Sequence, residues 1–354
     1  MTAREHQVRG LESAMRIRGP AFRLFAAASV ATAIVAGDQS HAAQLFENKT
    51  IDLVIGYASG GGYDIYGRLV ARHLGRHLPG IPVIVPRNMP GAGSITAANY
   101  IYNNAPKDGT TIGIVTQTLK EEELLETPGV RYQAGKFTWI GRVTSNVNLS
   151  VTWQTSKVKT IDDAMKYEFP VASNLIAGVL PTVLNNVVGT KFKLINGYAG
   201  SNEGMLAMER GETEGAMTTW DTLKVSKKDW LNANKVNIIV QYAPERHREL
   251  PAVPTMVELA RTQEDKQILE LFSAAASIGR SFVGPPGLSD DRVAALREGF
   301  QLMLKDPQFL AEIEKLRLEF DPMSGEKLQQ LVDGIRTASP AVRERARAAR
   351  DLKG

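Results

Sequence analysis

Apolar and polar residues follow one another along the chain in a repeating order of short strand-like and longer helix-like segments. From residue 50, the β-rich run TIDLVIGYA precedes DIYGRLVARHLGRHL, in which apolar residues recur every three or four positions. The segments PVIVP, SITAANYIYN and TTIGIVT then repeat the order strand, helix, strand. This alternation is typical of an α/β domain with a largely parallel sheet.

A second cycle of strands and helices follows residues 138–156, which have the pattern of two extended passes and predict the first crossing between two domains. This cycle ends in a proline-bearing connection at residues 245–260. Residues 281–320 then form one strand-like run followed by helices. Because helices with a single strand of their own need another sheet to pack on, we predict that the chain returns to the first domain through a second crossing.

The predicted architecture is therefore two α/β domains joined by a hinge, with a ligand cleft between them. Domain 1 is expected to be discontinuous and to comprise residues 43–148 and 275–354. Domain 2 is expected to comprise residues 149–274.

The first 42 residues have the layout of a secretory signal. Basic residues precede or begin a short apolar stretch, and the small residues Ser40 and Ala42 stand at the minus-three and minus-one positions of a cleavage site after Ala42. We predict a signal peptide over residues 1–42 and export of the protein, with Met15 as an alternative start to Met1. An uncleaved membrane anchor or a buried helix is the alternative interpretation.

Composition excludes several classes of function. The chain has 354 residues, of which 43% are hydrophobic, so it can build a sizeable core. Without residues 1–42, which hold five basic and three acidic residues, the net charge falls from +4 to +2. No basic stripe interleaved with aromatic residues occurs, so we predict no nucleic-acid partner. The absence of cysteine excludes disulfides, thiolate catalysis and cysteine-ligated zinc.

Three consecutive glycines, Gly60, Gly61 and Gly62, separate the first predicted strand from the first predicted helix. Amide groups at a helix start lack partners and carry positive potential, and bare backbone lets an anion come close to them. A dinucleotide fingerprint would need glycine or alanine at the position of Ile65, and no phosphate-loop motif occurs. The sequence predicts a carboxylate or phosphate site here, and a tight turn without a ligand is the alternative.

Residues beside the glycines have two interpretations each. A free carboxylate would repel an anion, so we predict that Asp64 caps the helix and fixes its start. Tyr57 and Tyr63 either flank a ligand with a ring and a phenolic donor or simply pack.

Candidates for catalysis are few. His73 and His77 are spaced to share a metal, but no third ligand is evident and arginines adjoin them, so we predict a solvated helix face and no metal site. The run Glu121, Glu122, Glu123 is predicted to be a solvated helix start. No nucleophile elbow and no zinc-protease motif occurs. We therefore predict no catalytic residue, no cofactor and no enzymatic activity.

Five segments in a fixed order carry a family resemblance. They are TIDLVIGYASGGGYDIYGRLVARHL, RNMPGAGSITAANYIYNNAPKDGTTIGIVT, INGYAGSNEGMLAMERGETEGAM, RELPAVPTMVEL and FVGPPGLSDDRVAAL. Together they resemble the solute receptors of the tripartite tricarboxylate transporters, called Bug proteins. The fourth segment matches that family's Leu-Pro-x-Val-Pro-Thr-x-x-Glu motif, and the similarity runs from about residue 50 to about residue 332.

The resemblance implies a type II-like periplasmic binding protein whose two α/β domains close over a small carboxylated solute. In that family, a glycine loop and a facing loop of the second domain bind the carboxylate largely through backbone amides and water. The first-domain positions that correspond are Tyr57, Ser59, Gly60, Gly61, Gly62 and Tyr63, with Asp64 supporting the loop, together with Thr116 and Gln117. The second-domain positions are Ser173, Asn174, Tyr198, Gly200, Ser201, Thr218, Thr219 and Trp220.

All these positions follow predicted strands, and ligands bind α/β sheets at the carboxyl ends of strands. Two have a second interpretation, since Ser201 fits a helix N-cap and Trp220 fits a core position. The chain departs from the family pattern at Tyr57-Ala58-Ser59 and at SNLIAGVLPT, so the ligand is not inherited from other members. The additional aromatic side chains point weakly to an aromatic or extended carboxylate.

The sequence thus predicts a monomeric periplasmic receptor that captures an organic anion and delivers it to the membrane subunits of a tripartite tricarboxylate transporter. One alternative is an α/β isomerase or hydrolase acting on a small acid through Asp64 and Tyr198. Another is a receptor that signals through a sensor partner and transports nothing.

Overall fold

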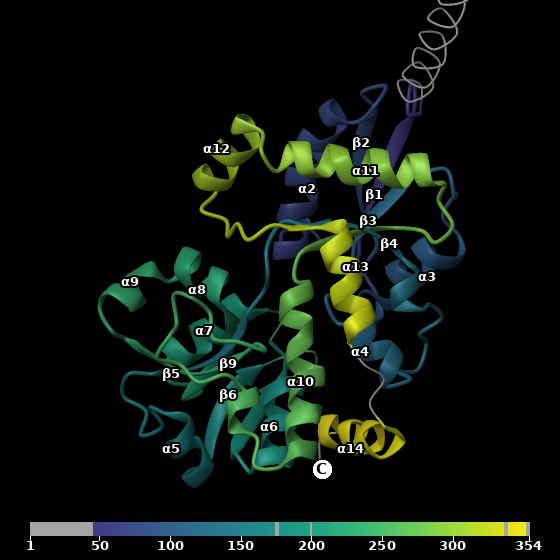
Figure 1. Ribbon diagram of the computed structural model, residues 1–354. Helices are drawn as coiled ribbons and strands as arrows, with labels where there is room; N and C mark the ends of the chain where they lie inside the picture. The colour runs from purple at the N-terminus through teal and green to yellow at the C-terminus, as the bar shows by residue number, and fades with distance from the viewer. Residues whose placement is uncertain (1–44, 174–176, 199, 336–338, 352–354) are drawn as a thin grey trace, which may run out of the picture.

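The computed structural model describes residues 45–173, 177–198, 200–335 and 339–351, so the predicted signal and Asn174 lie outside the described residues. Two separate sheets, each with helices on both faces, confirm the predicted α/β class (Figure 1). Within the described ranges, none of the helices has the length and apolar character that a membrane span requires.

The first sheet has six strands in the order β11-β4-β10-β3-β1-β2. The half formed by β3, β1 and β2 is parallel, whereas β10 runs antiparallel to both its neighbours, β3 and β4, and β11 runs antiparallel to β4. The strands are β1 (Thr50–Ile55), β2 (Val83–Asn88), β3 (Thr111–Ile114), β4 (Thr138–Arg142), β10 (Ser281–Gly284) and β11 (Met323–Ser324).

Side chains along β1 point alternately to the two faces of this sheet and contribute to the core on both faces. Ile51, Leu53 and Ile55 point into one apolar cluster and Val54 into another, as the two-residue period of a strand requires. Helices α2 (Gly62–Leu74), α11 (Asp290–Met303) and α12 (Pro307–Lys315) contribute to the first cluster. Helices α3 (Ile95–Asn103), α4 (Leu119–Leu124) and α13 (Gly325–Gly334) contribute to the second.

The second sheet has five strands in the order β7-β6-β8-β5-β9, with β6, β7 and β8 parallel and β5 antiparallel to both its neighbours. The strands are β5 (Asn148–Trp153), β6 (Phe169–Ser173), β7 (Phe192–Asn196), β8 (Gly215–Thr219) and β9 (Val236–Tyr242). One apolar cluster holds side chains of α5 (Ile161–Lys166), α6 (Val179–Val188), α10 (Gln263–Ile278) and α14 (Pro340–Arg350). The other holds side chains of α7 (Ser201–Glu209), α8 (Trp220–Ser226) and α9 (Lys228–Asn232).

Short 3-10 turns complete the described secondary structure and lie between the longer elements. They are η1 (Gly75–His77), η2 (Ala92–Ser94), η3 (Ala134–Lys136) and η4 (Val257–Leu259).

Two chain crossings connect the sheets, and they run side by side. Residues 143–147 lead from β4 to β5, and residues 279–280 lead from α10 to β10. Main-chain hydrogen bonds tie them together, because Val143 N donates to Arg280 O at 3.1 Å and Arg280 N donates to Thr144 O at 2.9 Å. The predicted crossing within residues 138–156 is present, and the crossings form a narrow two-stranded connection.

Gly279 is the residue that lets the second crossing approach the first. Its φ of +54° lies in the region that side chains disfavour, and a Cβ there would stand 2.2 Å from Thr144 O. Glycine is therefore required both by the backbone conformation and by the space.

The end of the chain packs differently from our expectation. Helix α14 contacts α6 and α10 beside the second sheet, although residues 275–354 were assigned to the first domain. It also reaches back to α4, since Arg347 Nε donates to Leu125 O at 2.9 Å. Our sequence reasoning assigned no element to residues 263–278, where α10 stands, and the domain boundaries stay a prediction.

Replacing Gly279 by alanine is expected to destabilise the protein by at least about 2 kcal/mol, because the Cβ meets a main-chain oxygen in a strained conformation. Denaturant unfolding measures the change. The matched control is Gly334→Ala, since no atom lies within 4 Å of its Cβ position, and it should stay within about 0.5 kcal/mol of the wild type. Equal stability of both variants would contradict the role assigned to Gly279.

Candidate ligand-binding site at the junction of the two sheets

The glycine loop lies where the sequence placed it, between β1 and α2. Helix α2 has Gly61 as its N-cap and Gly62 as its first residue, and no side chain caps the helix start. A Cβ at Gly60 or Gly61 would meet no atom within 4 Å, so the backbone there is uncovered. The arrangement leaves amide groups at the positive end of a thirteen-residue helix open to a ligand, except for Gly60 N, which is bonded to Asp64.

Asp64 fixes this loop from its third helical position and is not the N-cap that we predicted. Its carboxylate accepts hydrogen bonds from Gly60 N at 2.9 Å, Arg68 Nε at 2.9 Å and Asn88 Nδ2 at 2.8 Å, and also from Ser59. Burial alone would raise the pKa of Asp64, but these donors outweigh burial and lower it to about 2. The negative charge is therefore neutralised within the loop, and Asp64 supports the loop as predicted from the resemblance.

Two tyrosines line one side of the loop. The rings of Tyr57 and Tyr63 stack with their centroids 4.2 Å apart, and the Tyr63 hydroxyl accepts a hydrogen bond from Gln117 N at 3.1 Å. This contact joins the loops after β1 and β3, which leave the sheet at the same edge because the strands are parallel. Thr116 is buried at this edge. The structure thus brings the predicted first-domain residues together.

Arg280 packs against the ring of Tyr63 and is not among the site residues that the sequence predicts. Its guanidinium carbon lies 4.1 Å from the centre of the Tyr63 ring, and its Nη2 donates to Asn146 Oδ1 at 3.3 Å. Asn146 in turn donates to Gln117 Oε1 at 2.8 Å. Both Arg280 and Asn146 belong to the crossings between the sheets, and no motif in the sequence marks a crossing residue as part of a site.

The predicted second-domain residues gather at one edge of the five-stranded sheet, because they follow the parallel strands β6, β7 and β8. Ser173 is buried at the end of β6, and Thr218 is buried near the end of β8 with no hydrogen-bond partner for its hydroxyl. Tyr198 is half-buried and packs against the apolar cluster of this side.

One helix start in this second set differs from our expectation. The N-cap of α7 is Gly200, so Ser201 is its first helical residue and not its cap. Thr219 caps α8 and accepts a hydrogen bond from Thr222 N. Trp220 is 8% exposed and lies in the core cluster with Leu223, which agrees with the second interpretation of Trp220 as a core residue.

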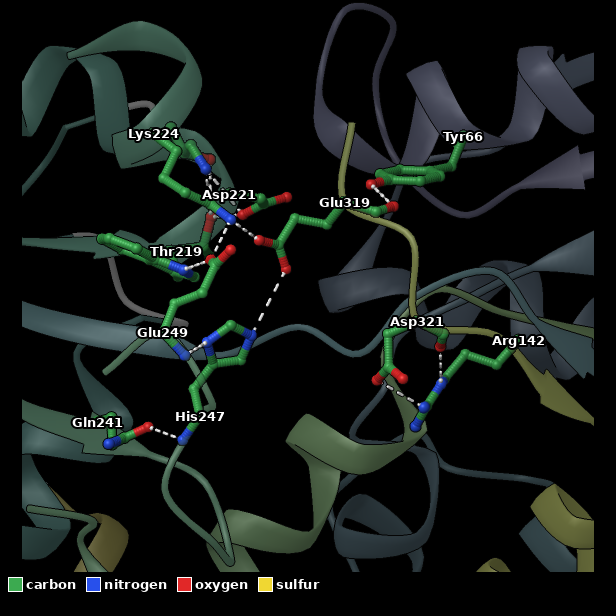
Figure 2. Close-up of polar contacts among 12 residues, drawn as sticks. Tyr66, Arg142, Thr219, Asp221, Lys224, Gln241, His247, Glu249, Glu319 and Asp321 are labelled. Atoms are coloured by element: carbon green, nitrogen blue, oxygen red, sulfur yellow. Dashed lines mark hydrogen bonds and ion pairs between the residues drawn. The ribbon is translucent and has the colours of Figure 1, made fainter. Parts of the chain in front are cut away.

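An ion-pair network joins the two sides of the molecule (Figure 2). Glu319, from the segment between α12 and β11, forms an ion pair with Lys224 of α8. Lys224 also binds Glu249 at 2.5 Å, and His247 lies 4.0 Å from Glu319. Burial would lower the pKa of Lys224, but the two carboxylates outweigh it and raise that pKa. Glu319 itself is held to the first side, since its main-chain oxygen accepts a hydrogen bond from the Tyr66 hydroxyl at 2.9 Å.

His247, Glu249 and Glu319 have ligand atoms within 4.8 Å of one another, a spacing that suits a metal ion. Lys224 contacts both carboxylates, and its ammonium group supplies the positive charge that a metal would bring. The geometry therefore favours an ion-pair network over a metal centre.

The other candidates for chemistry have structural partners. His73 is buried and bonded to Glu312 of α12 at 2.6 Å, and His77 bonds to Asp306 at 2.8 Å. The prediction that these histidines lie on a solvated helix face is therefore wrong. Glu121 is also buried, so the prediction of a solvated helix start is wrong at this residue, and burial and the neighbouring Glu122 raise its pKa well above the ordinary value. The two histidine contacts join α2 and η1 to α12 and its N-cap Asp306.

A cavity of about 650 Å³ opens beside α10 and α13, with Leu271, Leu331 and Ile335 among its lining residues. Its lining contains none of the predicted site residues. At the junction, the Thr218 hydroxyl and the Arg280 Nε are buried and have no hydrogen-bond partner.

Replacing Asp64 by asparagine is expected to cost about 2 kcal/mol of stability at pH 7, because its folded pKa lies nearly two units below the ordinary 3.8. A lowered pKa stabilises the fold above about pH 4, and this contribution disappears as the pH falls through about 2. Urea unfolding at pH 7 and pH 3 should therefore show a smaller difference between wild type and variant at the lower pH. Asp162→Asn, at an exposed position of α5, is the control and should be nearly neutral.

Comparisons with known proteins agree with the resemblance seen in the sequence. The family model described as tripartite tricarboxylate transporter family receptor matches residues 67–345. A curated protein of Cupriavidus necator, described as UPF0065 protein in gbd 5'region, is 25% identical over 315 residues and covers 86% of this chain and 90% of its own length.

Solved structures share the fold. MatC from Rhodopseudomonas palustris, solved with bound malate, matches with a TM-score of 0.59 and 20% identity over 85% of this chain and 99% of its own. A second R. palustris protein, solved with adipate, matches with a TM-score of 0.60 and 19% identity over 84% of this chain and 97% of its own. The periplasmic binding protein BugD matches with a TM-score of 0.59 and 20% identity, over 85% and 97% of the two chains. With a family model that spans most of its length, the chain belongs to the tripartite tricarboxylate transporter receptor family.

Proposed function

We propose that this protein is a periplasmic receptor that captures a small organic carboxylate as a monomer and delivers it to the membrane subunits of a tripartite tricarboxylate transporter. The observation that carries this proposal is the uncovered start of α2, where Gly60 and Gly61 have open space at their Cβ positions. Amides at a helix start bind anions through hydrogen bonds and through the helix dipole. Family membership supports the assignment to a transporter.

A carboxylate is the anion that we favour. Two proteins of the same fold were solved with malate and with adipate, both of which carry carboxylates. The stacked rings of Tyr57 and Tyr63 offer a flat apolar wall beside the amides, which suits an extended or aromatic acid. Trp220 contributes less to such a wall, because its ring is buried and its Nε1 is bonded to Glu249 at 2.6 Å.

Binding would proceed by closure of the two sides over the ligand in a cleft that excludes water. In the structure, one contact already joins the two sides, namely the ion pair between Lys224 and Glu319. Such a contact favours the closed arrangement, and a ligand that touches both sides would favour it further.

An enzymatic role for Asp64 has little physical support. A pKa of about 2 and four hydrogen-bond donors make this carboxylate a weak general base near neutral pH. Assays of turnover against mono-, di- and tricarboxylates, aromatic acids included, test this alternative directly.

Gly61→Val is expected to leave the fold intact and to weaken the binding of malate or adipate by at least about 100-fold. The valine side chain has room, because no atom lies within 4 Å of the Cβ position, but it covers the amides that would hold the carboxylate. Isothermal titration measures affinity, and thermal unfolding verifies the fold. A folded variant that binds as tightly as the wild type would refute the loop assignment.

Glu319→Gln is expected to weaken ligand binding by about 3-fold to 30-fold without unfolding the protein, because it removes a charge pair that favours closure. The effect should shrink at high salt, where exposed charges are screened. Glu209→Gln is the matched control, since Glu209 pairs with Lys227 at 3.1 Å on one side only. Equal affinities of the two variants would show that the Lys224 contact does not contribute to closure.

A further inference from the structure

Arg280 occupies an unusual position, in the crossing between the two sheets. Only 6% of it is exposed, and its Nη2 lies 2.8 Å from the Cβ position of Gly62, the first residue of α2. Glycine at that position therefore makes room for the guanidinium group at the start of the helix. The positive side chain and the positive end of the helix dipole meet at one point.

The charge of Arg280 has no carboxylate partner within ion-pair distance among the residues that the structure describes. Its Nε is buried and lacks a hydrogen-bond partner. The ring of Tyr63 lies against the guanidinium group and offsets part of the cost of burying an unpaired cation. A cation–π contact is weaker than the desolvation penalty of a buried charge, so most of the cost remains.

Arg142 in the neighbouring strand β4 shows how this protein satisfies a buried arginine. It is as buried as Arg280, but it forms an ion pair with Asp321 at 2.8 Å and donates to main-chain oxygens of Asp321 and Ser277. Both arginines lie at the junction, but among the described residues only Arg142 forms an ion pair with a carboxylate of the protein.

One carboxylate, that of Asp221, acts on Arg280 from beyond ion-pair distance. Burial would lower the pKa of Arg280, but Tyr63, Asp221, Tyr66 and Tyr57 together outweigh burial and raise that pKa. The three phenols are neutral near pH 7, so Asp221 supplies the one full negative charge among these groups. Asp221 belongs to the start of α8, and its carboxylate accepts hydrogen bonds from Thr219 and Thr222 N. Among the described residues, Arg280 therefore has no carboxylate within ion-pair distance, and its Nε has no hydrogen-bond partner.

We propose that Arg280 is the charge partner of the bound carboxylate, which lies between its guanidinium group and the uncovered amides at the start of α2. This inference rests on the proposed function and names the side chain that selects for an ionised ligand. Guanidinium groups bind carboxylates through charge-assisted hydrogen bonds, often two at once. Neutral analogues such as amides would leave the buried charge unpaired.

The position of Arg280 also links binding to closure. Its main chain is bonded to the other crossing through Val143 and Thr144, so an anion on the guanidinium group binds at the hinge itself. Closing the molecule without an anion buries an unpaired charge, whereas closing it with an anion buries a neutral pair. The ligand therefore has a higher affinity for the closed state, which is the condition for driving closure.

The test compares the wild type with Arg280→Met and Arg142→Met, two matched replacements of a buried arginine. Without ligand, Arg280→Met should unfold at a temperature equal to or above that of the wild type, whereas Arg142→Met should unfold at a clearly lower temperature. If Arg280→Met is destabilised as much as Arg142→Met, Arg280 is a structural residue and the proposal is overturned.

The second measurement is ligand binding, with malate, adipate and the neutral diamide of adipate as probes in isothermal titration. The wild type should bind at least one of the two acids and not the diamide. For that acid, affinity should fall by about 100-fold in Arg280→Met and by less in Arg280→Lys, which keeps the charge but loses the planar fork.

The outcomes separate the two proposals. If Arg280→Met binds the acid as tightly as the wild type while Gly61→Val does not, the receptor function stands and the role of Arg280 is overturned. If the wild type binds neither acid, the proposed function fails, and the role of Arg280 fails with it.

Discussion

The pair of hydrogen-bonded crossings between the two sheets is the constraint on which the rest of the structure depends. The main chains of Val143 and Thr144 form hydrogen bonds with the main chain of Arg280. Gly279 allows the two crossings to lie this close, because its positive φ disfavours a side chain and a Cβ would clash with Thr144 O. This connection places the guanidinium group of Arg280 beside Gly62, the first residue of α2. The proposed site, which combines the glycine loop with Arg280, depends on that placement.

Charge at this junction is distributed in a way that suits an anionic ligand. The carboxylate of Asp64 is balanced inside its own loop, so it does not cancel the positive potential of the helix start. Arg280 adds a full positive charge with no internal counterpart among the described residues. Farther along the junction, two glutamates neutralise the charge of Lys224. Lys224 therefore joins the two sides and is not proposed to bind the ligand.

The two kinds of ion pair at the junction have different physical roles. Arg142 and Asp321 lie on the first side, so their bond stabilises the fold whether the molecule is open or closed. Lys224 and Glu319 come from opposite sides, so their bond depends on the arrangement of the two (Figure 2). The proposed receptor function would use both kinds, because closure requires that the halves stay folded while their separation changes.

Local sequence patterns determined the alternating strands and helices and the glycine loop between them, because each depends on neighbours close in the chain. That alternation and the order of the family motifs predicted the fold class, and the first-domain site residues, which come from the family resemblance, stay a prediction. Tertiary contacts decided the rest. The burial of Trp220, the packing of α14 on α6 and the pairing of His73 with Glu312 all join segments that are distant in sequence. The position of Arg280 at the start of α2 is the clearest case, since 218 positions separate it from Gly62 and only folding brings them together.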